Sequence, residues 1–179
     1  VRPTVIMATV SEVLFESFCA ARQIAFERVP ETTESRPDYW IGSGVSRVVA
    51  EIKQIDPNDD DLEAMAQMAQ GNPAAMGSGP PGERIRKALR TANRQIRKLT
   101  DGRGLPGMVV VFNNTPCSLY TDPYSVMTAM RGLDVVPLHL TAPGQQDVFG
   151  SPHPGPRSEM RPDVNSSTSA IAVLSGADP

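Results

Sequence analysis

The chain has 179 residues, of which 40% are hydrophobic and 21% are charged, and its formal net charge is −3. That length suits one domain with its own core, so we expect residues 1–179 to form a single domain of an ordinary globular protein. The composition excludes a membrane-spanning protein, because nothing approaches the roughly 20 consecutive apolar residues of a transmembrane helix, and two cysteines are too few for a disulfide framework.

The N-terminal part of the chain predicts a helix followed by three short strands. Apolar residues recur at helical spacing in residues 11–23, with Ser11 as the expected N-cap. Residues 25–29 are expected to form a short strand. Residues 37–41 and 47–55 are expected to form two further strands, joined by a glycine-rich hairpin turn.

An irregular insert and a strongly amphipathic helix come next. Residues 56–82 are rich in Asp, Gly and Pro, so we expect a flexible insert there, with a short helix at residues 62–69. Residues 83–99 carry an apolar stripe at helical spacing, and basic residues occupy the rest of that helix. Residues 108–112 form an apolar run that suits a buried parallel strand.

The C-terminal part predicts one more helix and two strands. Asp122 and Pro123 suit the N-cap and first position of a helix that Gly132 ends. Three later segments are expected to be an edge strand, a Pro/Gly-rich loop and a last strand, in that order: residues 135–140, 141–165 and 169–174.

The order of these elements predicts an α/β fold with a central mixed β-sheet flanked by helices and a core at about residues 10–140. The N-terminal residues lack the basic segment and apolar run of a secretory signal, so we expect a cytoplasmic protein without a membrane partner.

The segment Val48–Lys53 contains the clearest chemical signal. Residues two apart on a strand share a face, so Glu51 and Lys53 point to one side while Ala50 and Ile52 point to the other. Asp38 precedes Glu51 by 13 residues, at the start of the preceding strand, where a hairpin brings its carboxylate alongside. The alternative is a purely structural role, in which Asp38 caps a turn and Glu51 and Lys53 form an exposed pair on one face of the strand.

Two carboxylates with room for water suit Mg²⁺, with Mn²⁺ as a substitute. Such an ion assists hydrolysis of a phosphodiester, and a neighbouring lysine stabilises the charge that develops on the phosphate. These residue types therefore indicate a metal-dependent phosphodiesterase, with Asp38 and Glu51 as metal ligands and Lys53 as the catalytic base or charge-stabilising group.

Pro37-Asp38, twelve residues and then Glu51-Ile52-Lys53 resemble the PD-(D/E)xK, or restriction-endonuclease-like, nuclease superfamily. The resemblance implies a core of helix, three-stranded antiparallel meander, helix and strand. It also implies that Glu16, on the first helix, is an auxiliary metal ligand and that Gln54 belongs to the catalytic set. Gln95 resembles the glutamine of exonuclease-like members, although Leu99 stands where those members have a tyrosine.

Eight of the 17 basic residues lie between Arg84 and Arg103, opposed there only by Asp101. Positive charge along one helix suits contacts to nucleic-acid phosphates, whereas the alternative is a solvated helix face. The expected substrate-binding residues are these: Arg86, Arg90, Arg94, Gln95 and Arg97.

The sequence thus predicts an Mg²⁺-dependent nuclease, with DNA as the preferred partner and endonuclease action as the preferred mode. Double-strand cleavage by one site per chain favours a homodimer. Two other hypotheses stay open: a catalytically silent nucleic-acid- or protein-binding domain on the same scaffold, and a nucleotide-binding enzyme. The last would use the glycine-rich residues 77–82, but Pro80 and Pro81 lack the N–H groups of a phosphate cradle.

Overall fold

The computed structural model describes residues 8–30, 35–77, 79–140, 148–155, 157–160 and 164–175. Residues 141–147, 156 and 161–163 of the expected Pro/Gly-rich loop lie outside the described residues. The helices are α1 (Val10–Ala21), α2 (Asp59–Ala69), α3 (Glu83–Thr100) and α4 (Pro123–Arg131), with 3₁₀ turns at Gly44–Ser46 and Ser118–Tyr120.

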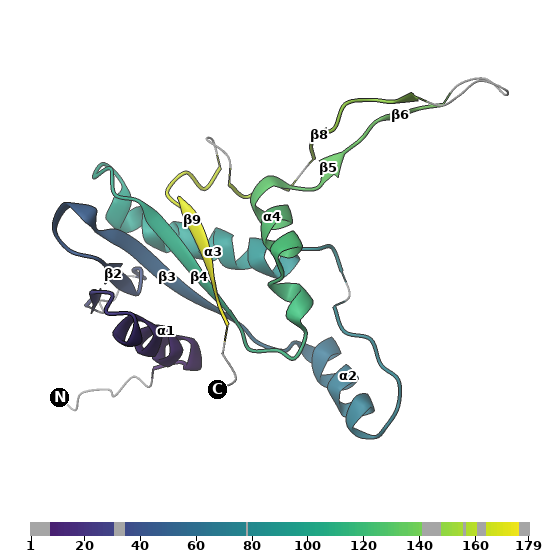
Figure 1. Cartoon of the computed structure of the whole chain (residues 1–179), viewed down its shortest axis with the longest axis horizontal. Helices are drawn as coiled ribbons and strands as arrows, with labels where there is room; N and C mark the ends of the chain where they lie inside the picture. Colours follow the sequence, from purple (N-terminus) through teal and green to yellow (C-terminus); the bar gives the residue numbers. More distant parts are fainter. Residues whose placement is uncertain are drawn as a thin grey trace.

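The centre of the molecule is a five-stranded mixed sheet in the order β1-β2-β3-β4-β9 (Figure 1). Its strands are β1 (Phe26–Arg28), β2 (Tyr39–Ile41), β3 (Val48–Ile55), β4 (Gly107–Asn113) and β9 (Ala170–Leu174). β1, β2 and β3 form an antiparallel meander, whereas β4 runs parallel to β3 and β9 runs parallel to β4. The expected mixed α/β sheet with flanking helices is confirmed.

Two hydrophobic clusters hold helices against opposite faces of this sheet. On one face, Phe15 and Cys19 of α1 pack with Tyr39, Ala50 and Ile52. On the other face, the apolar stripe of α3 packs against alternate residues of β3 and β4 and against α4; this cluster includes Ile85, Leu89, Ala92, Ile96, Val49, Val109, Val111 and Ala129. The period-2 alternation along β3 and β4 is therefore the reason that helices can cover both faces.

The helix ends follow local capping chemistry. Asp122 caps α4, Pro123 opens it and Gly132 ends it, as expected. The expectation that Ser11 caps α1 is wrong: Thr9 is the N-cap and forms a capping box with Glu12. Asn58 caps α2 in the same way, so this helix begins three residues before the expected start.

Residues after α4 form a narrow arm instead of an edge strand of the central sheet. β5 (Asp134–Val135) pairs with β8 (His153–Pro154), and β6 (Leu138–His139) pairs with β7 (Val148–Phe149). The expected single strand at residues 135–140 is thus replaced by two short ones, because Pro137 between them has no N–H to give to a ladder. The arm extends away from the sheet in Figure 1.

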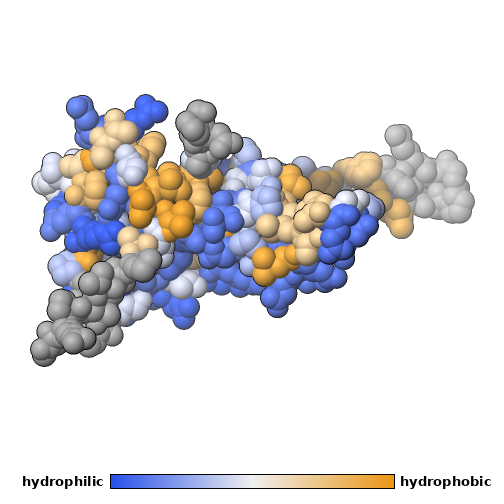
Figure 2. Space-filling model, turned by 90° about the horizontal axis from the view of Figure 1, so that it is seen from below, coloured by the Kyte–Doolittle hydropathy of each residue, from blue (hydrophilic) through white to orange (hydrophobic). Residues whose placement is uncertain are grey.

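Several apolar side chains remain on the surface outside these clusters. They include Val13 and Phe18 of α1 and Leu62 and Met68 of α2. Figure 2 shows the face seen from below the view of Figure 1, where apolar side chains gather in patches between hydrophilic ones. In the part of the chain that the structure describes, no helix combines the length and apolar character that a membrane span requires.

Candidate active site

Strands β2 and β3 separate where the sequence places its acidic residues. β2 pairs with β3 only as far as Tyr39 opposite Ala50, whereas β3 continues beside β4 to its end. The N–H of Asp38 donates to the Ala50 carbonyl at 3.2 Å. The Asp38 carboxylate then accepts a hydrogen bond from the N–H of Ile52 at 2.7 Å. The Asp38 side chain therefore hydrogen-bonds the β3 backbone just beyond the point where β2 stops pairing with β3.

Glu51 lies on β3 between Ala50 and Ile52, the two residues that Asp38 contacts. It is almost completely buried, with 1% of its surface exposed. Its Oε1 accepts a hydrogen bond from Lys53 Nζ at 2.5 Å. Lys53 also donates to Gln95 Oε1 of α3 at 2.9 Å, and Gln95 in turn donates to the Arg36 carbonyl at 3.2 Å. The structure thus brings together four of the residues that the sequence singled out, two of them on β3, one before β2 and one on α3.

The other carboxylate oxygen of Glu51 has no partner. Among the described residues, Oε2 of Glu51 is the buried side-chain oxygen or nitrogen for which the structure offers no hydrogen bond. Leaving such an oxygen unsatisfied is costly, and the cost rises when the group is charged. A buried carboxylate oxygen in this state, beside a second carboxylate, is the arrangement that a bound cation would satisfy.

Burial raises the pKa values of both carboxyl groups. Burial raises the pKa of Glu51 to about 7, and the nearby Asp38 adds to this rise while Lys53 opposes it. Burial also raises the pKa of Asp38 above its usual range, against the opposing effect of the Ile52 N–H and of Lys53. Without a cation, Glu51 is therefore expected to be partly protonated near neutral pH.

This proton makes stability depend on pH in a defined direction. Since the native pKa of Glu51, about 7, exceeds the ordinary value of 4.5, Glu51 keeps its proton to a higher pH in the native state than in the unfolded state. We therefore expect the free energy of unfolding in EDTA to fall as pH rises from about 4.5 to about 7, by roughly 3 kcal/mol at most from this group.

The measurement is urea denaturation at several pH values for wild type and Glu51→Gln. Because Gln does not titrate, the difference between the two proteins isolates Glu51 from every other group. The same pH dependence in both proteins would contradict the assignment.

The structure does not bring Glu16 to this site. Glu16 accepts hydrogen bonds from Arg28 at 2.6 Å and from the Tyr39 hydroxyl at 2.9 Å. Burial works against ionisation of Glu16, but these two donors overcome it and hold its pKa below the usual range. Within the described residues, no group of three or more His, Cys, Asp and Glu side chains forms a metal-binding cluster. The expectation that Glu16 is a third ligand is therefore not met by this geometry.

Gln54 also lies apart from the pair, because it is the neighbour of Lys53 and so points to the opposite face of β3. Its Oε1 accepts from the backbone N–H of Ser11 at 3.1 Å, and its Nε2 donates to Asp56 at 2.6 Å. These contacts tie the beginning of α1 to the end of β3. Gln54 also borders a groove beside Lys53, but its polar atoms bind Ser11 and Asp56.

The basic residues of α3 divide between two sides of the helix. Arg86 is buried and donates to Glu83 and to the Thr128 carbonyl, so the expectation that it binds substrate is wrong. Arg90 pairs with the buried carboxylate of Glu159, at 2.5 Å from Nη2 to Oε1. An α-helix turns 100° per residue, and both arginines therefore lie on the side of α3 turned away from Gln95.

Two further expected substrate contacts are exposed. Arg97 forms a long ion pair with Asp101, at 3.7 Å, one turn further along the helix. Arg94 precedes Gln95 and is exposed. Whether either contacts a substrate stays a prediction.

A groove of about 380 Å³ begins at Lys53 and follows α3 toward its N-terminus. Its helical wall consists of the residues that share the Gln95 side of the helix: Arg84, Lys87, Ala88 and Thr91. The basic side chains that border the groove are thus Arg84 and Lys87 together with Lys53, and neither Arg84 nor Lys87 is among the substrate-binding residues expected from the sequence. The helical phase relative to Gln95 is the signal that would have found them.

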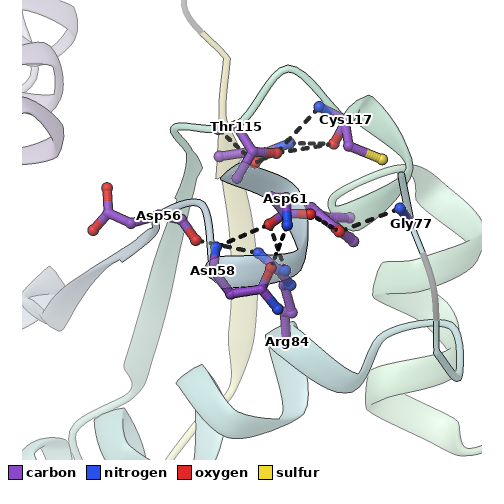
Figure 3. A network of polar contacts seen from close by, with 9 residues as sticks. Asp56, Asn58, Asp61, Gly77, Arg84, Thr115 and Cys117 are labelled. Atoms are coloured by element: carbon purple, nitrogen blue, oxygen red, sulfur yellow. Dashed lines mark hydrogen bonds and ion pairs between the residues drawn. The ribbon is translucent and has the colours of Figure 1, made fainter. Parts of the chain in front are cut away.

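Arg84 is held by a polar network around the start of α2 (Figure 3). Its guanidinium donates to buried Asp61 at 2.6 Å and lies 3.9 Å from the centre of the Tyr120 ring. The Tyr120 hydroxyl donates to the same carboxylate at 2.5 Å, and the Asn58 N–H donates to it at 3.0 Å. The pKa of Asp61 is held below its usual range: burial opposes ionisation, and the donors from Tyr120, Asn58 and Arg84 outweigh it. This network fixes one wall of the groove.

Comparisons with known proteins place few limits on this site. No protein-family model matches the chain, and no curated protein sequence matches it significantly. A comparison of structures finds similarity to SfsA of Pyrococcus furiosus, solved in complex with Ca²⁺, with a TM-score of 0.28 and 16% sequence identity. The match covers 79% of this chain and 60% of SfsA. A likeness this loose carries no conclusion on family or function.

Proposed function

We propose that the protein is a divalent-cation-dependent nuclease that hydrolyses phosphodiester bonds of nucleic acid, DNA in preference to RNA, and that it belongs to the PD-(D/E)xK superfamily. The observation that carries this proposal is the buried Oε2 of Glu51, which has no hydrogen-bond partner although Asp38 and Lys53 lie beside it. A structural carboxylate of this kind is normally satisfied by donors.

The donor set fits Mg²⁺ better than a transition metal. Asp38 and Glu51 offer hard carboxylate oxygens, and Mg²⁺ characteristically uses one or two carboxylates together with water and substrate phosphate. When bound, Mg²⁺ would polarise the phosphodiester and promote attack by water. The same ion would offset the repulsion from Asp38 that adds to the effect of burial on the pKa of Glu51.

Lys53 contacts the other carboxylate oxygen of Glu51, Oε1. Its ammonium group is held between the Glu51 carboxylate and the Gln95 amide oxygen, with 22% of its side chain exposed at the head of the groove. In that position Lys53 can donate a hydrogen bond to a phosphate oxygen and stabilise the negative charge that develops there. Gln95 restricts the rotamers of Lys53 and thereby keeps the ammonium group directed at the site.

The proposal is tested by incubating wild type with supercoiled plasmid and with single-stranded DNA, in Mg²⁺, Mn²⁺ or EDTA. We expect cleavage that requires the cation and is abolished by EDTA, and calorimetric titration should show Mg²⁺ binding that Glu51→Gln removes. Neither cleavage nor cation binding by a folded protein would refute the proposal and favour a catalytically silent binding domain. Cation binding that survives in Glu51→Gln would contradict the assigned ligands.

A further inference from the structure

The groove beside Lys53 continues into a second hollow at the N-terminal end of α3. This hollow, the Tyr124 pocket, has a volume of about 280 Å³. It shares Asn58, Arg84 and Lys87 with the groove, so the two spaces meet at the network of Figure 3. A chain-like ligand lying in the groove would therefore pass the pocket's opening.

The walls of the Tyr124 pocket combine flat apolar surface with hydrogen-bond acceptors. Tyr124 and Leu119 are 60% and 59% exposed, although both are large and apolar. Three carboxylate residues also line the pocket, Asp60, Glu83 and Asp122, two of which already serve the protein as the partner of Arg86 and the cap of α4. The basic residues lie at the shared border with the groove, and Arg84 there is bound to Asp61.

This distribution of charge selects among the parts of a nucleotide. Carboxylates inside the pocket repel a phosphate, but they accept hydrogen bonds from the ring and exocyclic N–H groups of a base. An exposed tyrosine ring provides a stacking surface, which binds bases with little regard to sequence. Lys87, at the border, is placed to contact the phosphate that stays outside.

We propose that the Tyr124 pocket receives one unstacked base of the substrate strand, so that the substrate is single-stranded or frayed nucleic acid. A base inside a continuous duplex is stacked and paired, and it would have to be extruded at a cost before it could enter. This inference rests on the proposed nuclease function for the identity of the strand, although its test does not depend on cleavage.

The spacing along α3 predicts which base enters. Gln95 accepts a hydrogen bond from Lys53, and Lys87 precedes Gln95 by about two turns of α3. At 1.5 Å per residue this separation is about 12 Å. Where the bases between the groove and the pocket stay stacked, the strand rises about 3.4 Å per nucleotide, so this distance corresponds to roughly three to four nucleotides. The base in the pocket is therefore expected to lie about that far from the bond beside Lys53.

The test measures binding of wild type, in EDTA and at one fixed salt concentration, to a labelled single-stranded oligonucleotide and to the blunt duplex of the same sequence. We expect tighter binding of the single strand. Tyr124→Ala should weaken single-strand binding about tenfold, and Tyr124→Phe, which keeps the ring, should not. Lys87→Ala should also weaken it, beyond the effect of Arg103→Ala, which removes the same charge from the turn after α3.

A matched control is Phe149→Ala, which removes an exposed aromatic ring from the arm, where the side chain is 72% exposed. Equal affinities for wild type, Tyr124→Ala and Phe149→Ala would overturn the inference, as would tighter binding of the duplex. If wild type cleaves DNA and Tyr124→Ala binds normally, the pocket fails and the nuclease stands. If wild type binds through Tyr124 and does not cleave, the nuclease fails and the pocket stands.

A second readout locates the base. In oligonucleotides with one abasic position moved stepwise along the strand, affinity for wild type should fall at a single position, and that fall should be absent in Tyr124→Ala. An even response at all positions would overturn the assignment of one base to one pocket.

Discussion

Lys53→Ala is expected to slow DNA cleavage in saturating Mg²⁺ by roughly a hundred- to a thousandfold, the usual effect of removing one group that stabilises transition-state charge. The loss should appear mainly in kcat, because charge on the phosphate develops only as the bond breaks. The measurement is the initial rate of plasmid nicking by equal concentrations of folded wild type and variant.

Two further proteins make this result specific. Arg22→Ala removes one exposed positive charge at the end of α1, away from the junction of β2 and β3, and should cleave at the wild-type rate. Lys53→Met keeps much of the side chain without its charge and should be as inactive as Lys53→Ala. Since Lys53 is a partner of buried Glu51, a thermal melt of each variant establishes that the protein tested is folded. Normal cleavage by folded Lys53→Ala would rule out a catalytic role for Lys53.

Asp61→Ala is expected to lower the free energy of unfolding by about 3 kcal/mol, which is the usual cost of removing one partner of a buried ion pair. Asp61 is buried and accepts hydrogen bonds from Arg84, Tyr120 and the backbone N–H of Asn58. Removing its carboxylate leaves a largely buried guanidinium and a phenol without their acceptor, and it also removes the capping box of α2.

The measurement is urea denaturation at neutral pH, where the depressed pKa keeps Asp61 ionised. Asp59→Ala provides the control, because Asp59 is exposed in the same first turn of α2 and contributes only its favourable interaction with the helix dipole, about 0.5 kcal/mol. Similar stabilities for the two variants would contradict the role of the network.

Much of the fold could be predicted from sequence because its signals are local. β3 and α3 have strong periodicity, and the residues that bound α4 act within one turn of helix. The expected helix covers α2 only in part, because α2 starts at Asp59, in an acidic run where Asn58 caps the helix and Asp61 completes the capping box. The arm could not be predicted because the pairing of β6 with β7 joins segments separated by residues 140–147, and local patterns do not specify such a pairing.

The candidate site likewise combines residues that local patterns place correctly with contacts between distant parts of the chain that those patterns do not specify. Asp38, Glu51 and Lys53 come from one hairpin, so strand alternation suffices to place them near each other. Glu16 could be assigned only through a family resemblance, and in the fold its side chain is taken up by Arg28 and Tyr39. The charge of the α3 arginines was evident in the sequence. The acidic partner of Arg90, however, is Glu159, which lies far along the chain.

The hydrogen bond from the Ile52 N–H to Asp38 makes one backbone amide sensitive to the state of the whole site. The electron density on that carboxylate changes whenever it gains a proton or turns to a cation, and the shielding of the amide proton changes with it. A single cross-peak in a ¹H–¹⁵N correlation spectrum can therefore follow titration and cation loading in the unmodified protein. Ile52 contributes no side-chain chemistry to the site, yet its amide is the resonance to assign first.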